Sequence, residues 1–244
     1  LVNTLLRGDA PAPIMRFLAG ASLTALNKKQ GGIRPIAVGD VIRRLVSKCV
    51  CAHMSEKFAS YLIPEQVGVA VSGGMEALVH AFRRYLERNR DNPNCVIFKA
   101  DFQNAFNRVK RTAFLHIVYQ RFPTIFRWVS ACYSTPTRLR YLGQYLSSEE
   151  GVQQGDPLGP FLFCIVLKDL TDSFKEIADI ELNMWYMDDG SVMGRIEEVT
   201  KIIQHIISEG PRLGLVLNTL KSELVFPNDT HKHSIEGIPI TENC

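Results

Sequence analysis

Hydrophobic and polar residues alternate with the period of strands in some segments of this chain and with the period of helices in others. Two strand-like runs around a polar turn at 27–32 predict a β-hairpin over residues 21–38. An apolar run at 95–100 predicts one buried strand. Two runs around an Asp-Asp-Gly triplet predict a second hairpin over 182–193, because glycine tolerates the positive φ of a tight turn. Shorter strand-like segments follow at 214–218 and 224–226.

Helical spacing, with apolar residues at i, i+3 and i+4, separates these strands. Asp40 is a suitable N-cap for the first helix, whose apolar stripe starts at Val41 and Ile42 and reaches Met54. The opposite side of that helix would carry three basic residues, Arg43, Arg44 and Lys48. Further helical stripes lie at 75–86, 114–119, 161–174 and 199–207. Residues 128–146 interleave aromatic and basic side chains, which is typical of a nucleic-acid track or of a twisted amphipathic hairpin.

The order of these elements predicts a layered α+β arrangement with antiparallel pairing at its centre. The 244 residues, 46% of them hydrophobic, suffice for one large domain or two closely packed ones. No apolar run approaches the ~20 residues of a membrane span. Six scattered cysteines favour free thiols in a reducing compartment over a zinc site. We therefore expect an intracellular protein of nucleus or cytoplasm. Its start at Leu1 indicates a segment of something longer.

Positive charge is concentrated at the start of the chain. Residues 1–50 hold eight basic and two acidic residues, although the whole chain carries a net charge of only +3. A basic front part suits a polyanionic ligand, and a solvated basic face is the alternative. Lys28, Lys29 and Arg34 lie on the predicted first hairpin, where they would embrace a triphosphate or simply form a basic surface.

Three carboxylates stand at predicted strand ends. Asp188 and Asp189 follow one strand of the second hairpin, and Asp101 follows the strand at 95–100. Each alone is more typical of a solvated turn. If the strands are neighbours in a sheet, however, the three carboxylates converge and repel one another unless a cation neutralises them. Oxygen ligands favour a hard cation such as Mg²⁺, and two such ions would support in-line phosphoryl displacement.

The loop at 151–160 is a second candidate for a binding surface. Two glycines bracket Gln153 and Gln154, Asp156 is placed to cap the following helix, and Pro157 suits its first position. Exposed backbone amides beside a helix N-terminus form a good wall for a nucleotide or a base pair. Carboxylates, basic hairpin and loop together indicate nucleotidyl transfer.

Ordered motifs of the chain resemble those of reverse transcriptases. They are GGIRPI at 31–36, DFQNAF at 101–106, QQGDPLGP at 153–160, YMDD at 186–189, and GLVLN at 214–218 with KSE at 221–223. The match covers about residues 20–226 and is most similar to the enzymes of non-LTR retrotransposons. Met187 departs from that group, in which Ala is more frequent, and matches the form familiar from retroviral enzymes.

The resemblance implies a right-hand polymerase fold, α+β, with fingers and palm and a missing thumb. The palm would be a ferredoxin-like antiparallel sheet packed on helices. Fingers would occupy about residues 1–94, the palm mainly 95–226, and 227–244 would begin the connection to the thumb.

The resemblance also implies a set of site residues. Asp101, Asp188, Asp189 and the backbone carbonyl of Phe102 would hold two Mg²⁺ ions, with Mn²⁺ as a substitute. Lys221 would donate a proton to pyrophosphate, unless it is a surface cation. Phe106 would exclude a 2′-hydroxyl, unless it is a core aromatic. The other expected nucleotide-binding residues are Lys28, Lys29, Arg34, Gln154 and Gly155. The expected template- or primer-binding residues are Arg43, Arg44, Tyr186 and Met187.

The implied activity is RNA-directed DNA synthesis by a retroelement protein, which adds dNTPs to a primer. Its partners would be an RNA template, a DNA primer, dNTPs, and the thumb and endonuclease or other domains of a longer polyprotein. One alternative is an RNA-directed RNA polymerase, against which Phe106 argues. The other is a repurposed fragment that binds nucleic acid without catalysis. We expect residues 1–244 alone to be poorly processive or inactive.

Overall fold

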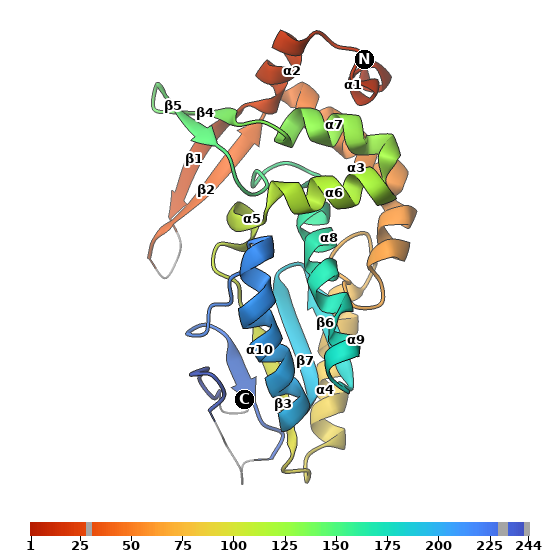
Figure 1. Cartoon of the computed structure of the whole chain (residues 1–244), viewed down its shortest axis with the longest axis vertical. Helices are drawn as coiled ribbons and strands as arrows, with labels where there is room; N and C mark the ends of the chain where they lie inside the picture. The colour runs from red at the N-terminus through yellow and green to blue at the C-terminus, as the bar shows by residue number, and fades with distance from the viewer. Residues whose placement is uncertain (28–30, 229–233, 242–244) are drawn as a thin grey trace. The chain divides into compact units, whose positions relative to one another are not determined.

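The computed structural model describes residues 1–27, 31–228 and 234–241. They form two compact units, and each unit combines two separate stretches of the chain (Figure 1). Unit 1 comprises residues 1–55 and 106–166, and unit 2 comprises 56–105 and 167–244. The contacts thus divide the chain differently from the expected fingers and palm ranges, whose assignment stays a prediction. Among the described residues, three helices contribute residues to both units: α3 (Val41–Leu62), α8 (Gly159–Asp172) and α5 (Ala105–Arg108), of which only Ala105 belongs to unit 2.

Unit 1 contains a four-stranded sheet with the order β2-β1-β4-β5. The predicted hairpin over 21–38 is confirmed as the antiparallel pair β1–β2, and β1 also pairs in parallel with β4. The segment at 128–146, which left two readings open, folds as the end of a helix and the hairpin β4–β5. The elements of this unit are α1 (Val2–Arg7), α2 (Ala12–Ala19), β1 (Ala21–Asn27), β2 (Ile33–Gly39), α5 (Ala105–Arg108), α6 (Arg111–Arg121), α7 (Pro123–Tyr133), β4 (Thr137–Tyr141) and β5 (Gln144–Ser148).

Unit 2 contains an antiparallel sheet with the order β6-β7-β3-β8. Strand β3 is buried on both faces. Cys95 and Ile97 pack in a cluster with Tyr85 of α4, whereas Val96 and Phe98 alternate with them toward the face where α10 lies (Figure 1). The elements are α4 (Gly74–Arg88), β3 (Cys95–Ala100), α9 (Phe174–Ile177), β6 (Leu182–Tyr186), β7 (Asp189–Arg195), α10 (Ile196–Leu213) and β8 (Glu223–Val225). The expected antiparallel central sheet is confirmed.

The buried face of α3 differs from the predicted stripe. Val41 and Ile42 are exposed, and the inward positions are Arg43, Val46 and Val50, followed by Met54. The sequence carries apolar residues on two sides of this helix, so periodicity alone chose the wrong one at its start. The structure instead buries a charged residue, because Arg43 finds a buried acidic partner.

None of the helices in the described ranges is both long enough and apolar enough to cross a membrane.

Candidate active site

The hairpin β6–β7 carries the acidic pair at its tip. Tyr186 pairs with Asp189, so Met187 and Asp188 form the loop. The positive φ that such a turn requires falls on Met187, at 56°. The sequence had assigned this role to Gly190, which lies in β7 opposite Trp185. That prediction was wrong by a few positions, because the two strands pair as far as Tyr186 and Asp189, so the turn comes before Gly190.

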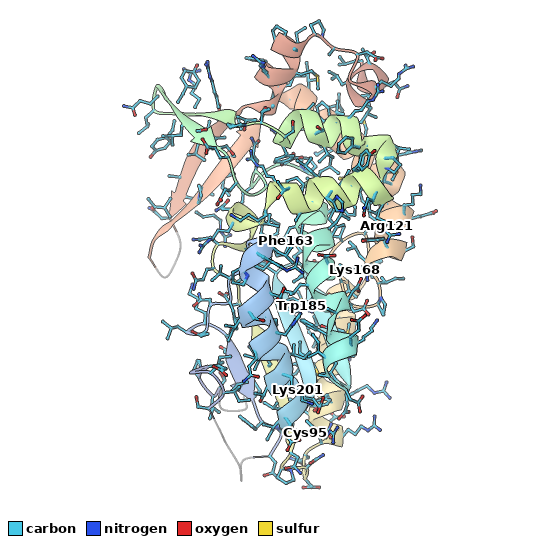
Figure 2. The ribbon with its side chains drawn as sticks, viewed as in Figure 1. Cys95, Arg121, Phe163, Lys168, Trp185 and Lys201 are labelled. Carbon is cyan, nitrogen blue, oxygen red and sulfur yellow. The ribbon has the colours of Figure 1, made fainter. Side chains whose placement is uncertain are left out.

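Gly190 is required for a different reason. A Cβ at this position would overlap the ring of Trp185, which is buried inside unit 2 (Figure 2). The same ring stacks on Phe102 at a centroid distance of 5.8 Å. The stacked rings therefore connect the β6–β7 hairpin to Phe102, the residue that follows Asp101.

Replacing Gly190 by alanine is expected to lower the free energy of unfolding by about 1–3 kcal/mol, the usual cost of overpacking a core. Urea denaturation measures this change. Gly194→Ala, in the same strand, is the matched control, because a Cβ there would meet its nearest neighbour at an ordinary 3.5 Å. Equal stability of the two variants would contradict the assigned packing role of Trp185.

Asp101 lies beside this acidic tip. Strand β3 pairs with β7 as far as Ala100 opposite Gly190, so the next residues on the two strands are Asp101 and Asp189. The expectation that Asp101 and the hairpin occupy adjacent strands is confirmed. Asp101 and Asp188 are half-buried and Asp189 is exposed, so the carboxylates lie at a solvent-accessible sheet end.

The backbone around Asp101 is fixed by the segment that precedes β8. The Asp101 amide donates to the Ser222 hydroxyl at 3.1 Å, and its carbonyl accepts from the Asn218 amide at 2.8 Å. Lys221 is exposed and lies between these two residues in the chain. Sequence reasoning singled out Lys221 and missed the role of the buried Ser222, although Ser222 stands in the same KSE motif.

The acidic residues influence one another. The pKa of the Asp189 carboxyl is raised, first by desolvation and then by the nearby charge of Asp101, while Lys99 acts in the opposite direction. Lys99 is itself paired with Glu223. A charged Asp189 is therefore disfavoured in the fold, and a bound cation would relieve the repulsion.

The donor chemistry of this site fits a hard divalent ion, since carboxylate oxygens are the ligands Mg²⁺ prefers. In the part of the chain that the structure describes, however, no three His, Cys, Asp or Glu side chains converge closely enough to enclose a metal. The suitability of this site for a divalent ion thus rests on the neighbouring carboxylates and on the repulsion between them.

The described residues among those expected to bind the nucleotide, Arg34, Phe106, Gln154 and Gly155, are found in unit 1. Phe106 is half-buried and stacks on Phe163 of α8 at 4.7 Å between ring centroids. Its backbone carbonyl accepts from the Val152 amide at 2.8 Å, so the backbone of Phe106 is attached to the loop at 151–160. A half-buried ring is compatible with packing and with a substrate contact.

The loop at 151–160, called the Gln154 loop below, is hydrogen-bonded to strand β2. The Gln154 carbonyl accepts from the Ala37 amide at 2.9 Å, and Gly155 has a φ of 132°. A Cβ on Gly155 would lie 2.6 Å from the Ala37 carbonyl oxygen, so only glycine allows this approach. Arg34 is exposed on the same strand. Lys28 and Lys29 lie outside the described residues.

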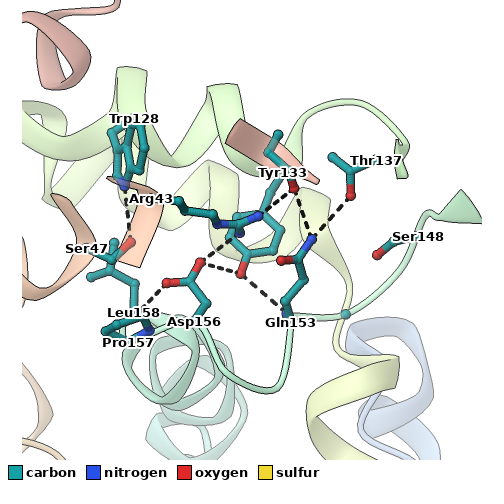
Figure 3. A network of polar contacts seen from close by, with 12 residues as sticks. Arg43, Ser47, Trp128, Tyr133, Thr137, Ser148, Gln153, Asp156, Pro157 and Leu158 are labelled. Atoms are coloured by element: carbon teal, nitrogen blue, oxygen red, sulfur yellow. Dashed lines mark hydrogen bonds and ion pairs between the residues drawn. The ribbon is translucent and has the colours of Figure 1, made fainter. Parts of the chain in front are cut away.

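Arg43 does not lie where a template contact requires. It is fully buried, its guanidinium bonds the Asp156 carboxylate at 2.8 Å, and it donates to the Ala19 carbonyl at 2.5 Å (Figure 3). The Tyr133 hydroxyl donates to the same carboxylate at 2.8 Å. This expectation was wrong: Arg43 stabilises the base of the Gln154 loop.

The neighbours of Arg43 keep it charged. Burial alone would lower the pKa of its guanidinium, but Tyr133, Cys132 and Asp156 reverse this effect and raise it. Asp156 also accepts from the Leu158 amide at 3.0 Å, in the turn just before α8. The helix begins at Gly159, two residues later than the predicted start at Pro157.

The remaining residues expected to contact template or primer are more accessible. Arg44 is half-buried on α3 in unit 1, and Tyr186 and Met187 are half-buried at the hairpin tip in unit 2. The five cysteines in the described ranges are free, as expected, with Cys49 exposed.

Residues 26–238 match the family described as reverse transcriptase (RNA-dependent DNA polymerase). The chain is 27% identical over 236 residues to the retrotransposable element SLACS 132 kDa protein of Trypanosoma brucei gambiense, with 92% of this chain and 19% of that protein covered. The chain thus spans about a fifth of this relative.

Solved telomerase structures share the fold. Apo telomerase from Candida tropicalis, truncated from its C-terminal domain, superposes with a TM-score of 0.61 at 15% identity, covering 84% of this chain and 49% of that one. Telomerase from Candida albicans, in complex with a TWJ fragment of telomeric RNA, gives 0.62 at 14% identity, covering 92% and 44%. The expected right-hand polymerase fold is thereby confirmed.

Proposed function

Since this chain belongs to the reverse transcriptase (RNA-dependent DNA polymerase) family, we propose that it adds dNTPs to the 3′-hydroxyl of a primer on an RNA template. The observation that carries the proposal is the register of β3 and β7, which places Asp101 beside the acidic hairpin tip. In this reaction the primer 3′-oxygen bonds to the α-phosphorus of the dNTP. The bond from this phosphorus to the oxygen that bridges it to the β-phosphate breaks, pyrophosphate leaves, and the proton of the 3′-hydroxyl passes to water.

Asp101, Asp188, Asp189 and the carbonyl of Phe102 would hold the metal ions, for which the carboxylate donor set is suited. When bound, two Mg²⁺ ions would stabilise the charge on the attacking and leaving oxygens. Lys221 would supply the proton that pyrophosphate takes up. Tyr186 and Met187, at the hairpin tip, would contact the primer end.

Unit 1 would bind the nucleotide and the template. Arg34 and the lysines at 28 and 29 would bind the triphosphate, Gln154 and Gly155 would contact the incoming nucleotide, and Arg44 would contact the template. The support for this assignment is the attachment of the Gln154 loop to β2 and to Phe106. The loop is thus hydrogen-bonded through its backbone both to β2 and to the backbone of Phe106.

Replacing Phe106 by valine is expected to relax sugar selection, because the smaller side chain leaves room for a 2′-hydroxyl. The ratio of dNTP to NTP incorporation should fall by at least about tenfold on one primed RNA template. Phe126→Val, in α7, serves as the control and should leave the ratio unchanged. An unchanged ratio in the Phe106 variant would show that the ring only fills the core.

The function itself is tested by extension of a labelled primer on an RNA template, with and without Mg²⁺, by the natural polypeptide that carries this chain. We expect extension with dNTPs that requires the ion. Tight RNA binding without any extension would instead favour a repurposed binding protein, and extension with NTPs alone an RNA-directed RNA polymerase.

A further inference from the structure

Met187, at the tip of the acidic hairpin, has a backbone conformation that most side chains avoid. Its φ of 56° lies in the left-handed region, and it has a Cβ and an unbranched side chain rather than the hydrogen of glycine. Such a conformation persists where surrounding contacts fix it. Because Asp188 follows directly, the backbone of Met187 determines where the acidic pair points.

The side chain of Gln66 forms hydrogen bonds with both polar groups of the Met187 backbone. The Gln66 Oε1 accepts from the Met187 amide at 2.8 Å, and the Gln66 Nε2 donates to the Met187 carbonyl at 3.0 Å. The same Oε1 accepts from the Gly68 amide at 2.9 Å. Gln66 is 3% exposed, so these bonds do not compete with bulk water. An amide is the side chain that offers an acceptor and a donor side by side.

The backbone on either side of Gln66 is hydrogen-bonded to β6. The Trp185 amide donates to the Glu65 carbonyl at 2.7 Å, and the Val67 amide donates to the Trp185 carbonyl at 2.8 Å. Residue 66 thus forms a parallel bridge with Trp185. The Glu65 side chain, 4% exposed, is paired with Lys175 at 2.5 Å.

The neighbouring glycine allows the close approach. A Cβ on Gly68 would lie 2.5 Å from the Met187 nitrogen and 3.0 Å from its Cγ. At Gly68 the segment therefore approaches the hairpin tip so closely that residue 68 has no room for a Cβ.

We propose that Gln66 is a positioning residue for the polymerase reaction: it holds Met187 in the left-handed conformation and thereby orients the carboxylates of Asp188 and Asp189. The proposal rests on the proposed function of these carboxylates. Gln66 acts through Met187 and touches no reacting atom.

The test replaces Gln66 by methionine, which preserves length and removes all three hydrogen bonds, and by glutamate, which keeps the acceptor and removes the donor. Gln204→Met and Gln204→Glu are matched controls, because Gln204 is exposed on α10 and its amide donates to the exposed Glu236 carboxylate. All variants are compared in the natural polypeptide that carries this chain.

We expect Gln66→Met to lower kcat for dNTP incorporation about 10–100-fold, the range for residues that orient metal ligands. The Mg²⁺ concentration for half-maximal rate should rise, and the KM for dNTP should change less than about threefold. Gln66→Glu should fall between this variant and the wild type, and both Gln204 variants should match the wild type. A Gln66→Met protein with wild-type kcat and Mg²⁺ dependence would overturn the proposal.

Hydrogen exchange provides a measurement that does not depend on activity. In the wild type, the Met187 and Gly68 amides should exchange slowly, and in Gln66→Met they should exchange at least about tenfold faster while the amides of β3 remain protected. Rapid exchange of Met187 in the wild type would contradict the proposal even if the variants failed to fold. If the wild type extends no primer, the proposed function fails, whereas faster exchange of the Met187 amide in Gln66→Met would still show that Gln66 holds the hairpin tip.

Discussion

Replacing Asp156 by alanine is expected to lower the free energy of unfolding by about 3–5 kcal/mol, the usual cost of leaving a buried charge without its partner. The side chains of Arg43 and Asp156 are only 1% and 2% exposed and meet at 2.8 Å. The substitution also removes the acceptor of the Tyr133 hydroxyl. Because Asp156 follows Gly155 directly, the Gln154 loop should lose its order together with this network.

Urea denaturation of the variant measures the loss. Asp172→Ala is the matched control. The Asp172 carboxylate, which pairs with Lys168, is 48% exposed, and pairs of exposed charges contribute about 0–1 kcal/mol. A double variant, Arg43→Met with Asp156→Leu, should recover most of the stability, because an apolar pair of similar volume leaves no charge unpaired. If Asp156→Ala were no more destabilising than Asp172→Ala, the structural role given to Arg43 would be wrong.

Replacing Asp189 by asparagine is expected to change activity and stability in opposite directions. Incorporation of dNTPs should fall at least about 100-fold, since removing a proposed metal ligand should cost more than the 10–100-fold lost with an outer-shell group. Stability without divalent ions should rise slightly. A pKa raised in the fold means that the ionised carboxylate opposes folding at neutral pH, and asparagine removes that charge from beside Asp101.

Primer extension and thermal unfolding in a chelator measure the two effects. Asp91→Asn is the matched control, because Asp91 is an exposed acid that precedes β3, whereas Asp101 follows it. The control should affect neither quantity appreciably. Full activity of Asp189→Asn, or a loss of stability in the chelator, would contradict the assigned pair of repelling carboxylates.

The sequence was sufficient to predict the parts of the fold that follow from local patterning. Alternation around polar turns predicted the pairs β1–β2 and β6–β7, and the apolar run before Asp101 predicted strand β3. Their adjacency could be inferred because three carboxylates at strand ends make chemical sense only together. The ordered motifs then identified the family.

Features that depend on tertiary contacts were beyond such patterns. The partner of Arg43 lies 113 residues away, so the burial of this cation could not be read from the periodicity of α3. The positive φ of Met187 is supported by Gln66, 121 residues earlier, and not by the glycine that follows the acidic pair. Gln66 lies outside every predicted helix and strand, because a single bridge to β6 leaves no strand pattern in the sequence.

The most direct test of the proposed reaction compares the wild type with Asp188→Asn in extension of a DNA primer on an RNA template. Asparagine keeps the shape of the side chain but replaces one carboxylate oxygen, and the negative charge, with an amide group. The natural polypeptide that carries this chain should extend the primer with dNTPs and Mg²⁺. The variant should fold with unchanged stability and lose at least about 99% of this activity. Equal incorporation by a folded Asp188→Asn variant would contradict the account.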